Sequence, residues 1–359
     1  MRSNPNVIEQ HVTLREALAR LNSLSGREMT LFVVDTLDNL TVMGTLTDGD
    51  VRRALLAGRT LESDVAEAMC RNFRYLTNSN VDQVDSIRGM RRRGINMIPV
   101  VDREGRLVEI TDLNRRTSRL PLSAILMAGG KGERLRPLTN HTPKPLLQVD
   151  GKAIIDYNVE ALARVGINDI TVTTRYLAEQ IHDHFAAPVA GVNVKCVTER
   201  IPMGTLGSAS LVSRPEKGHT LIMNSDLLTS ISFEDMYLKH RNNDAAVTVG
   251  VIPYQVSVPY AILDVDDNKV IDINEKPSFS HFANAGIYIF RNDILNRLMP
   301  NESIDTPDFI RRVIAEGFKV TYFVIDGTWI DIGSHTDYVQ AVELMRHHRN
   351  LNESRDRID

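Results

Sequence analysis

The sequence of 359 residues contains only two cysteines, Cys70 and Cys196, and they lie far apart. This scarcity excludes a disulfide framework and a cysteine-ligated zinc site, and it fits a reducing cytoplasm. No apolar run approaches the ~20 residues of a membrane-spanning helix, and the first ten residues, MRSNPNVIEQ, contain no apolar signal core. We therefore expect a cytoplasmic protein that has no membrane partner.

A strong excess of charge of one sign is also missing. The formal net charge is -4, whereas a dedicated nucleic-acid binder would carry a large basic excess. We expect no nucleic-acid partner. The chain does have an ordinary apolar content, over a length that suggests about two domains.

The first third of the chain contains a weak internal repeat, over residues 12–58 and 80–116. Each copy predicts a helix, a strand, a turn, a second strand and a second helix. Two units of this length would bury a shared face. Thr47–Asp50 (TDGD) and Thr111–Asn114 (TDLN) occupy equivalent places, where a strand ends and a helix is expected to begin, so that Thr or Asp can cap the helix.

This region, roughly residues 7–117, resembles a pair of cystathionine-β-synthase-type (CBS) modules in the segments GTLTDGDVRRAL, MIPVVDREGRL and LVEITDLNR. The resemblance implies an α/β CBS pair over 1–119, with a regulatory or assembly role and a tendency to form a homo-oligomer. It also implies an adenine nucleotide as a possible ligand, whose ribose and phosphate Thr47 and Asp50 would contact. The second copy departs from the pattern, with Asn114 at the acidic position. The residues themselves leave open the alternative that both elements only cap helices.

Pro121, within SRLPLS, would interrupt a helix continuing from the repeat and marks a linker. Strand and helix patterns then alternate over 122–350, which predicts an α/β domain with a mainly parallel sheet. Closely spaced strand patterns between residues 245 and 290 predict an antiparallel lobe. The functional sites of such a sheet lie at the carboxyl ends of its strands.

One such strand, SAILMAG, leads into the segment LMAGGKGERLRPLTNHTPKP, residues 126–145. Its glycines would let backbone amides approach an anion closely. Arg134 offers a bidentate donor fork and Lys144 a point charge. Two cations over one loop suit a triphosphate, while the alternative is an ordinary Gly-Pro turn. The glycines are Gly129, Gly130 and Gly132.

The pattern G-G-x-G-x-R-L-x-P-L-T-x-x-x-P-K-P-L-L over Gly129–Leu147 resembles the signature of the sugar-1-phosphate nucleotidyltransferases, and the resemblance extends over about 123–344. It implies a Rossmann-like domain that joins a nucleoside triphosphate to a sugar-1-phosphate. Arg134 and Lys144 would be catalytic, holding the triphosphate and the attacking phosphate. Leu126 and Ala128, together with the three loop glycines, would contact the nucleotide.

Two acidic residues match the metal-binding pair of this family. They are Asp226, in MNSD, and Asp331, in WIDIG. The match implies Mg²⁺, which typically takes one or two carboxylates together with phosphate oxygens and water. The alternative for a lone strand-end Asp is a helix or turn cap.

Two further segments match the sugar-binding side of the family. In NEKP, Glu275 would contact sugar hydroxyls and Lys276, a catalytic cation, the phosphate of the sugar. In NAGIYIF, Asn284 and Gly286 would contact the sugar. Taken alone, EKP is also compatible with a surface turn.

The segment ERIPMGTLGSA resembles the base-reading loop of the family, with Glu199 at the base edge. An ionised carboxylate only accepts hydrogen bonds, so it can pair with guanine N1–H and N2–H₂ together, and this favours GTP. Gly204 and Gly207 would let the loop close over the base.

We therefore predict a Mg²⁺-dependent guanylyltransferase that acts on a sugar-1-phosphate. A CBS pair ahead of such a domain resembles the glucosamine-1-phosphate guanylyltransferases of bacterial legionaminic-acid synthesis. Alternatives within the class are uridylyl-, cytidylyl- and mannose- or heptose-1-phosphate guanylyltransferases. Alternatives outside it are an inactive nucleotide sensor and a nucleic-acid-binding CBS protein. One departure from the family is Ser334-His335, where a proline usually follows the D-I-G motif.

Overall fold

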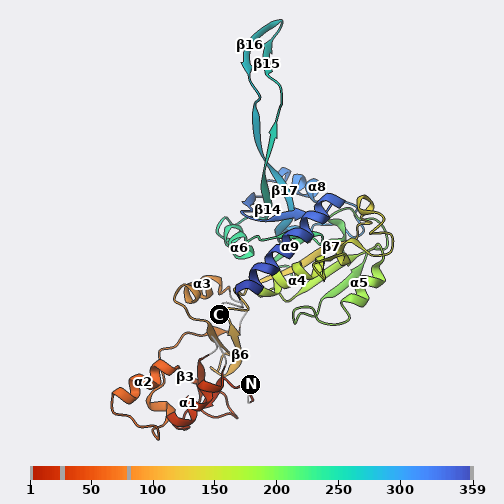
Figure 1. The fold of residues 1–359 in the computed structure, drawn as a ribbon. Helices are drawn as coiled ribbons and strands as arrows, with labels where there is room; N and C mark the ends of the chain where they lie inside the picture. The colour runs from red at the N-terminus through yellow and green to blue at the C-terminus, as the bar shows by residue number, and fades with distance from the viewer. Residues whose placement is uncertain (1–2, 25–28, 79–81, 356–359) are drawn as a thin grey trace. The chain divides into compact units, whose positions relative to one another are not determined.

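The computed structural model describes residues 3–24, 29–78 and 82–355. Its chain divides into two units (Figure 1), Met1–Pro121 with Arg164–Gly166 and Leu122–Ala163 with Ile167–Asp359. No helix in the described part of the chain is long and apolar enough to cross a membrane.

The N-terminal unit contains two small sheets, one for each copy of the repeat, in the orders β1-β2-β3 and β4-β5-β6. In each sheet the first two strands are parallel and the last two are antiparallel. The short first strands, β1 and β4, are additions to the predicted pattern. The strands are β1 Val7–Glu9, β2 Leu31–Val34, β3 Val42–Leu46, β4 Leu76–Thr77, β5 Met97–Val101 and β6 Leu107–Asp112. The helices are α1 Leu14–Ser23, α2 Asp48–Leu56, α3 Val84–Arg92 and the 3₁₀ turn Val65–Glu67.

Helix α1 shows how the local sequence sets these elements. Thr13 caps it, its side chain accepting a hydrogen bond from Glu16 N at 3.3 Å. Leu14, Ala17 and Leu21 recur at helical spacing and are all buried. They pack against Leu31, Val33 and Leu46.

The second copy of the repeat ends differently from the prediction. A helix is expected from Asp112 onward, and this expectation is wrong, because β6 runs to Asp112 and a turn follows. Asp112 Oδ1 accepts a hydrogen bond from Asn114 N at 2.8 Å, and such a turn gives the backbone an alternative to a helix. Arg116 N bonds Asp112 O at 2.8 Å, which makes a single helical turn that is not continued.

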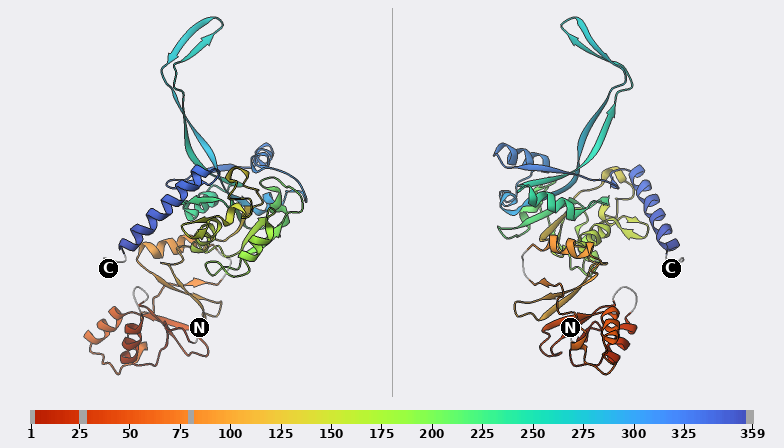
Figure 2. Two further views of the ribbon diagram at one scale, coloured as in Figure 1. Left: turned by 45° about the vertical axis from the view of Figure 1, so that its right-hand side comes forward. Right: turned by 90° about the vertical axis from the view of Figure 1, so that its left-hand side faces the viewer.

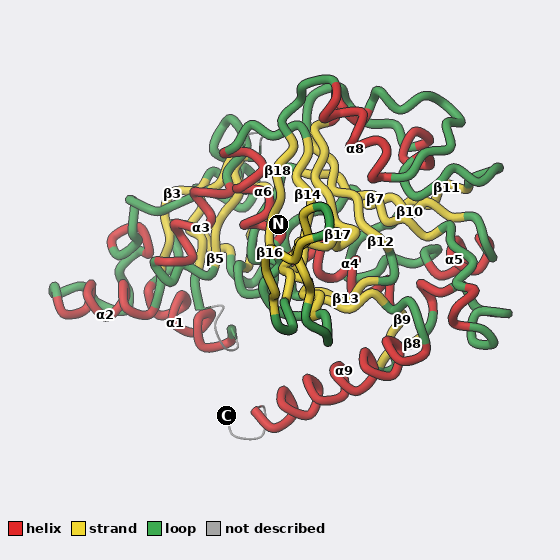
Figure 3. Tube along the Cα trace, turned by 90° about the horizontal axis from the view of Figure 1, so that it is seen from above, coloured by secondary structure: helices red, strands yellow, loops and turns green. Residues whose placement is uncertain are grey.

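The C-terminal unit is built on a seven-stranded sheet of order β11-β10-β7-β12-β17-β14-β18 (Figure 3). Four of its six neighbouring pairs are parallel, and the two pairs that involve β17 are antiparallel. This confirms the predicted mixed, mainly parallel α/β sheet. The strands are β7 Leu122–Ala128, β10 Ile170–Thr174, β11 Lys195–Thr198, β12 His219–Asn224, β14 Val247–Ser257, β17 Ser278–Arg291 and β18 Val320–Val324.

Helices cover this sheet and smaller strand pairs lie beside it. The helices are α4 Ile154–Arg164, α5 Ala178–His184, α6 Phe233–Asn242, α7 Asn292–Leu295, α8 Thr306–Ala315 and α9 His335–Arg355, with 3₁₀ turns at Glu133–Leu135, Lys144–Leu146 and Gly207–Leu211. The short strands are β8 Gln148–Val149, β9 Lys152–Ala153, β13 Leu227–Thr229 and β19 Trp329–Asp331.

Two apolar clusters hold the C-terminal unit together. In the first, Ile125 and Ile222 of the central strands and Phe290 of β17 pack with Phe309 and Val313 of α8. In the second, α4, β19 and α9 share one core, of which Ile154, Ile330 and Ala341 are members. The second core fixes the strand that ends in Asp331.

The predicted antiparallel lobe takes a different form. β14 and β17 belong to the main sheet, but both continue beyond it as a two-stranded ribbon that ends in the hairpin β15 Ile262–Asp266 and β16 Lys269–Asn274. Figures 1 and 2 show this ribbon projecting from the C-terminal unit. We call residues 253–282 the arm.

Candidate active site

A cavity of about 370 Å³, which we call the cleft, opens at the carboxyl ends of four parallel strands. β7, β10, β11 and β12 all end beside it, in agreement with the expectation for such a sheet. The first residue after each strand lines the cleft. These residues are Gly129, Arg175, Glu199 and Ser225.

The glycines of the loop after β7 differ in their surroundings. A Cβ at Gly129 would lie 2.7 Å from Glu199 Oε1, so only glycine lets the loop pass this side chain. Gly130 has no atom within 4 Å of its Cβ position, which leaves its backbone open to the cleft. Gly132 has φ 61°, and a Cβ there would lie 2.9 Å from Thr139 Cγ2. The Thr139 hydroxyl donates to Gly132 O at 2.8 Å and fixes this turn.

Asp226 and Asp331 come together through strand pairing. β13 and β19 are antiparallel, with Leu227 opposite Asp331, and Ile332 N donates to Asp226 O at 3.2 Å. Both carboxylates face the ammonium group of Lys144, which donates to Asp226 Oδ2 and lies 3.6 Å from Asp331 Oδ1. The structure therefore unites three of the predicted residues.

Arg134 joins this group from the loop. A Cβ at Gly333 would lie 3.1 Å from Arg134 Nη2, so the guanidinium packs against the segment that follows Asp331. It also favours the ionised form of the Asp331 carboxyl. Arg134 and Lys144 therefore both lie near Asp331.

Ser334-His335 stand where the family usually has a proline, and hydrogen bonds hold this segment in place. Ser334 N and Ser334 Oγ both donate to Asp337 Oδ2, at 2.8 and 2.7 Å, and Asp337 N donates back to Ser334 Oγ at 3.3 Å. This reciprocal cap starts α9 at His335. A proline is not required to begin the helix.

The two carboxylates fit a divalent metal ion. Burial raises the pKa of Asp331, and the nearby Asp226 raises it further, against the opposing effects of Lys144 and Arg134. Asp226 Oδ1 is buried without a hydrogen-bond partner in the described part of the chain, and a buried, unpaired oxygen is costly unless a ligand satisfies it. No group of three or more His, Cys, Asp or Glu that could hold a metal ion occurs among the described residues. A metal at this pair would therefore need further oxygen ligands from substrate or water, as Mg²⁺ commonly has.

Asn284 and Gly286 lie next to the cleft. Asn284 Oδ1 accepts from Gly286 N at 3.0 Å, and its Nδ2 donates to Tyr288 Oη at 2.7 Å. Gly286 has φ 71°, and a Cβ there would lie 2.6 Å from Nδ2 of Asn224, which lines the cleft. Glycine at 286 thus keeps this side of the cleft open.

Glu199 is buried at the other side of the cleft, against Gly129. Burial raises the pKa of its carboxyl group, while hydrogen bonds from Ser208 and Met203 N, together with the charge of Arg175, act in the opposite direction. Arg175 is not among the residues that the sequence predicts for the site. Its position directly after the strand DITVTT was the available signal.

Not all of the predicted residues line the cleft. The segments described above hold five that lie outside its lining, Gly132, Arg134, Asn284, Gly286 and Asp331. Leu126 is fully buried within β7, while Glu275 and Lys276 are exposed on the arm. Gly204 lines the cleft, but a Cβ there would lie 2.5 Å from Ile304 O. Its close packing is therefore against the backbone near Ile304.

In the N-terminal unit, Thr47 and Asp50 form a capping box. Thr47 N donates to Asp50 Oδ2 at 2.8 Å, and Asp50 N donates to Thr47 Oγ1 at 3.4 Å. Arg53 also pairs with Asp50 at 2.5 Å. The hydrogen-bonding groups of both residues are thus engaged in starting α2.

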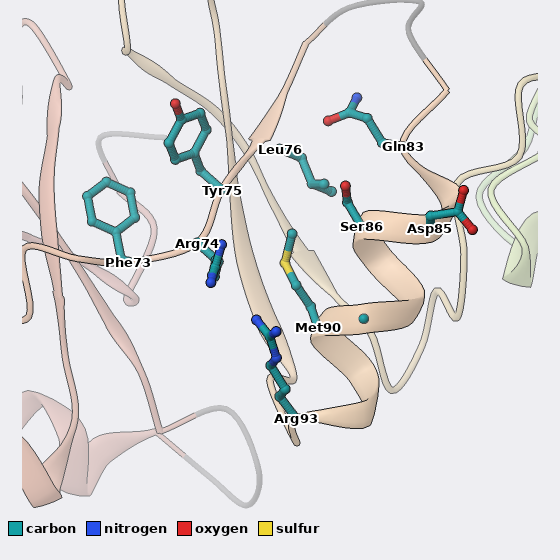
Figure 4. Close-up of a pocket in the computed structure, with 10 residues that line it drawn as sticks. Phe73, Arg74, Tyr75, Leu76, Gln83, Asp85, Ser86, Met90 and Arg93 are labelled. Atoms are coloured by element: carbon teal, nitrogen blue, oxygen red, sulfur yellow. The ribbon is translucent and has the colours of Figure 1, made fainter.

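A separate cavity of about 550 Å³ lies beside α3 in the same unit (Figure 4). Arg74 and Arg93 point into the same space, with Met90 beside them, as Figure 4 shows. The rings of Phe73 and Tyr75 lie 5.9 Å apart at its edge. This combination of cations and aromatic rings could accept a ligand that carries both an anionic and a flat apolar part.

Comparison with known proteins identifies the C-terminal unit. The model of the family described as "Nucleotidyl transferase" matches residues 123–348. A protein named as a mannose-1-phosphate guanyltransferase, from Sulfolobus acidocaldarius, is 30% identical over 229 residues, 62% of this chain and 63% of that protein. The mannose-1-phosphate guanylyltransferase catalytic subunit beta of Drosophila pseudoobscura pseudoobscura is 32% identical over 232 residues, 62% of each chain. The match thus spans less than two thirds of these relatives.

Among solved structures, a glucose-1-phosphate thymidylyltransferase from Bacillus anthracis is 24% identical, with a TM-score of 0.49. The match covers 63% of this chain and 95% of that one.

Proposed function

Because the chain belongs to the nucleotidyl transferase family, we propose that it transfers a nucleotidyl group from GTP to a sugar-1-phosphate and releases pyrophosphate. The observation that carries this proposal is the grouping of Arg134, Lys144, Asp226 and Asp331, of which Lys144 and Asp226 line the cleft. Two cations and two carboxylates grouped beside one cleft suit a triphosphate that arrives with a metal ion.

In this reaction an oxygen of the sugar phosphate attacks the α-phosphorus, and the bond from that phosphorus to the β-phosphate oxygen breaks. The attacking oxygen is already ionised, so no general base is needed. Arg134 and Lys144 hold the triphosphate and balance charge that builds up at the α-phosphate, and the open backbone of Gly130 approaches the phosphates. Asp226 and Asp331 would hold Mg²⁺, which supplies further positive charge to phosphate oxygens.

Lys144 also has a role before substrate binds. It is only 12% exposed and is paired with both carboxylates, so it keeps two like charges close together. When a triphosphate binds with its metal ion, Lys144 would pair with phosphate oxygens and the two carboxylates would bind the metal.

We propose that Glu199 reads guanine, accepting from N1–H and N2–H₂. Its location beside the glycine-rich loop places an acceptor at the end of the cleft opposite Asn284. The guanylyltransferase names of the relatives also favour GTP. UTP and CTP remain the alternatives, since part of the carboxylate already accepts bonds from the protein.

For the sugar we propose glucosamine-1-phosphate. The enzyme would then act in the cytoplasm, where its nucleotide-sugar product would be used to synthesise legionaminic acid for surface glycans. Mannose-1-phosphate is the first alternative, because it is the substrate in the names of the relatives, and heptose-1-phosphate is the second. Asn284 and Gly286 would contact the sugar.

We further propose that the N-terminal unit is a CBS pair that regulates or assembles the enzyme. Thr47 and Asp50 would contact an adenine nucleotide only if the capping box opened or shared its oxygens. The cavity beside α3, with Arg74 and Arg93, is a second location for such a ligand.

The test is a matrix of four NTPs against glucosamine-, mannose-, glucose- and heptose-1-phosphate, with pyrophosphate release as the readout and Mg²⁺ present. GTP with one sugar phosphate should give turnover that chelation abolishes. No turnover in any combination, with nucleotide binding retained, would support a nucleotide sensor instead of an enzyme.

A further inference from the structure

Arg175 contributes a positive charge to the cleft to which the proposed reaction gives no role. The residue is half-buried and lines the cleft directly after β10. Within residues 3–24, 29–78 and 82–355, its guanidinium forms no hydrogen bond and no ion pair. Lys144, by contrast, is held by two carboxylates. A guanidinium carries five N–H donors, so those of Arg175 are available to a ligand.

Strand pairing places Arg175 beside Glu199. β10 and β11 are parallel, Thr174 lies opposite Thr198, and Glu199 N donates to Thr174 O at 2.8 Å. Arg175 and Glu199 each follow one of these threonines, so their Cα atoms lie about 5 Å apart, the spacing of neighbouring strands. Both residues line the same cleft. Burial raises the pKa of Glu199, and the charge of Arg175 opposes that rise.

The segment that begins at Arg175 is fixed to the glycine-rich loop. Tyr176 Oη donates to Thr139 O at 3.0 Å, and Gln180 Nε2 donates to His141 O at 2.9 Å. These bonds hold the start of α5 against the loop. Arg175 is therefore presented from a backbone whose position is already set, as discrimination between similar ligands requires.

The edge of guanine presents its polar groups in a fixed order. N7 and O6 are acceptors, and N1–H and N2–H₂, which follow them around the base, are donors. Glu199 is proposed to accept from N1–H and N2–H₂, so a side chain next to it faces O6 and N7. Arginine binds these two acceptors together through its planar fork, which is the commonest specific contact to guanine. The neighbouring pair Arg175 and Glu199 thus matches the order of groups on this base.

The other bases lack this combination. Adenine has an amino group in place of O6, and this donor would face the donors of Arg175. Cytosine and uracil are single-ring bases and have no N7. An arginine beside the carboxylate therefore favours guanine over all three.

The triphosphate is the other anion that Arg175 could bind. The cations proposed for phosphate, Arg134 and Lys144, both lie near Asp331. The charge of Arg175 instead acts on Glu199. This separation places Arg175 on the base side of the cleft.

We propose that Arg175 is a specificity-determining residue that donates to O6 and N7 of guanine while Glu199 accepts from N1–H and N2–H₂. This inference rests on the proposed use of GTP. The two side chains together would read the whole polar edge of the base.

The test compares GTP with two analogues, using the sugar-1-phosphate that gives the highest turnover. 7-Deaza-GTP lacks N7 and ITP lacks the N2 amino group, so they report on Arg175 and Glu199 separately. The wild type should have a kcat/KM about tenfold higher for GTP than for 7-deaza-GTP, because one bond of a bidentate pair is lost.

Arg175→Met should use GTP and 7-deaza-GTP equally well and keep the wild-type ratio of GTP to ITP. Its kcat/KM for GTP should fall by about 5–150-fold, the range expected for a bidentate contact to a base, while the values for UTP and CTP stay unchanged. Glu199→Gln should show the reverse pattern, losing the ratio of GTP to ITP and keeping that of GTP to 7-deaza-GTP. Arg200→Met, at an exposed position outside the cleft lining, is the matched control and should change neither ratio.

Three results would overturn the proposal. The first is a wild type that uses GTP and 7-deaza-GTP equally, which needs no variant to be folded. The second is an equal loss with all four NTPs in Arg175→Met, which would assign Arg175 to the phosphates. The third is the same change of ratio in Arg200→Met as in Arg175→Met.

A binding measurement separates this inference from the proposed transfer reaction. Calorimetric titration of the full chain with GDP and with 7-deaza-GDP, without any sugar phosphate, should show about tenfold tighter binding of GDP. Arg175→Met should abolish that difference. A wild type that turns over no sugar phosphate but shows this difference would refute the transfer reaction and leave the role of Arg175 intact. Equal affinities in the wild type would overturn the role of Arg175 even if GTP is the substrate.

Discussion

The ammonium group of Lys144 donates a hydrogen bond to Asp226 Oδ2, although 82 positions separate the two residues in the sequence. The glycine- and proline-rich segment that carries Lys144 and the turn after β12 that carries Asp226 meet because β7 and β12 are parallel neighbours. The contact makes the cleft a prepared ion-binding site, in which the protein's own cation occupies the place beside the carboxylates.

The first prediction concerns the two carboxylates. Asp226→Asn and Asp331→Asn should each lower Mg²⁺-dependent turnover by more than the roughly 10–100-fold that outer-shell partners of a metal contribute, because each removes an anionic ligand. Pyrophosphate release over a range of Mg²⁺ concentrations is the measurement. Asp308→Asn, on the exposed face of α8, is the control and should leave turnover unchanged. Near wild-type rates in both variants would show that these two carboxylates do not bind the metal ion.

The second prediction concerns base selectivity. In Glu199→Gln an amide donor replaces one acceptor and faces the donors of guanine. The preference for GTP over UTP and CTP should fall by roughly 1–3 kcal/mol, the cost of a lost hydrogen bond with an unmatched donor. Ratios of kcat/KM for the four NTPs measure it, with the exposed Glu216→Gln as the control. An unchanged ratio would assign base reading to the backbone or to another side chain.

The third prediction concerns the stability of the same variant. Burial raises the pKa of Glu199 above its ordinary value of 4.5, so the unfolded chain releases this proton more readily than the folded one. The contribution of Glu199 to stability is therefore full below about pH 4.5 and is lost as the pH rises through the raised pKa. Glu199→Gln should melt at a higher temperature than the wild type at pH 7, with a smaller difference at pH 4. An equal difference at both pH values would contradict a pKa raised by burial.

The fourth prediction concerns a buried histidine outside the cleft. His240 is fully buried, with one ring nitrogen 2.7 Å from Thr248 Oγ1 and the other 3.0 Å from His219 Nδ1. Burial, with help from His219 and Arg291, lowers its pKa from 6.5 to about 3. Between these values the unfolded state binds one more proton, so this residue should make stability fall by about 1.4 kcal/mol per pH unit on acidification.

Urea unfolding at several pH values from 4 to 7 tests this expectation. His240→Gln should flatten the dependence on pH, whereas His347→Gln, at an exposed position on α9, should not. If the His240 variant keeps the wild-type slope, another group is responsible for the acid sensitivity.

The fifth prediction concerns the N-terminal unit. Asp50→Ala removes the acidic half of the capping box of α2 and should lower the stability of that unit by about 1 kcal/mol. Basal turnover should be unchanged, because the proposed chemistry lies in the other unit, while any response to AMP, ADP or ATP should disappear. Asp48→Ala, which removes the ion pair with Arg52 but leaves the capping box of Thr47 and Asp50 intact, is the control. A retained nucleotide response in Asp50→Ala would favour the cavity near Arg74 and Arg93.

Local sequence was enough to predict four strands of the main sheet, β7, β10, β11 and β12, and the residues of its glycine-rich loop, whereas β14 and β17 were assigned to a separate lobe and β18 was not predicted. The apolar segments have the alternation and length that are typical of strands, so few other structures fit them. Gly129 to Lys144 form one continuous segment, so the spacing of its residues can be read directly from the sequence. Asp226 and Asp331 could be proposed as partners only by resemblance, since nothing in the sequence indicates that Leu227 lies opposite Asp331. That pairing is a long-range contact, and only the tertiary structure provides it.

The sequence also could not exclude a helix after Asp112, because T-D-L-N is compatible with a cap and with a turn. The side chain of Asp112 bonds Asn114 N and the chain leaves the helical path, which depends on a balance of local hydrogen bonds. Arg175 could not be predicted as a site residue either, because the sequence does not show that it lies near Glu199.

What the sequence determined by itself is the chemistry of the loop and the type of sheet that presents it, since both follow from local spacing and from the alternation of strands and helices. What only the tertiary structure decided is which distant side chains meet. It brings Asp226, Asp331 and Lys144 together through strand pairing, and it leaves Lys276 exposed on the arm, beyond the paired strands β14 and β17. A pattern of residues specifies what each group can bind, but the hydrogen-bonded register between strands sets the distances over which those groups can act together.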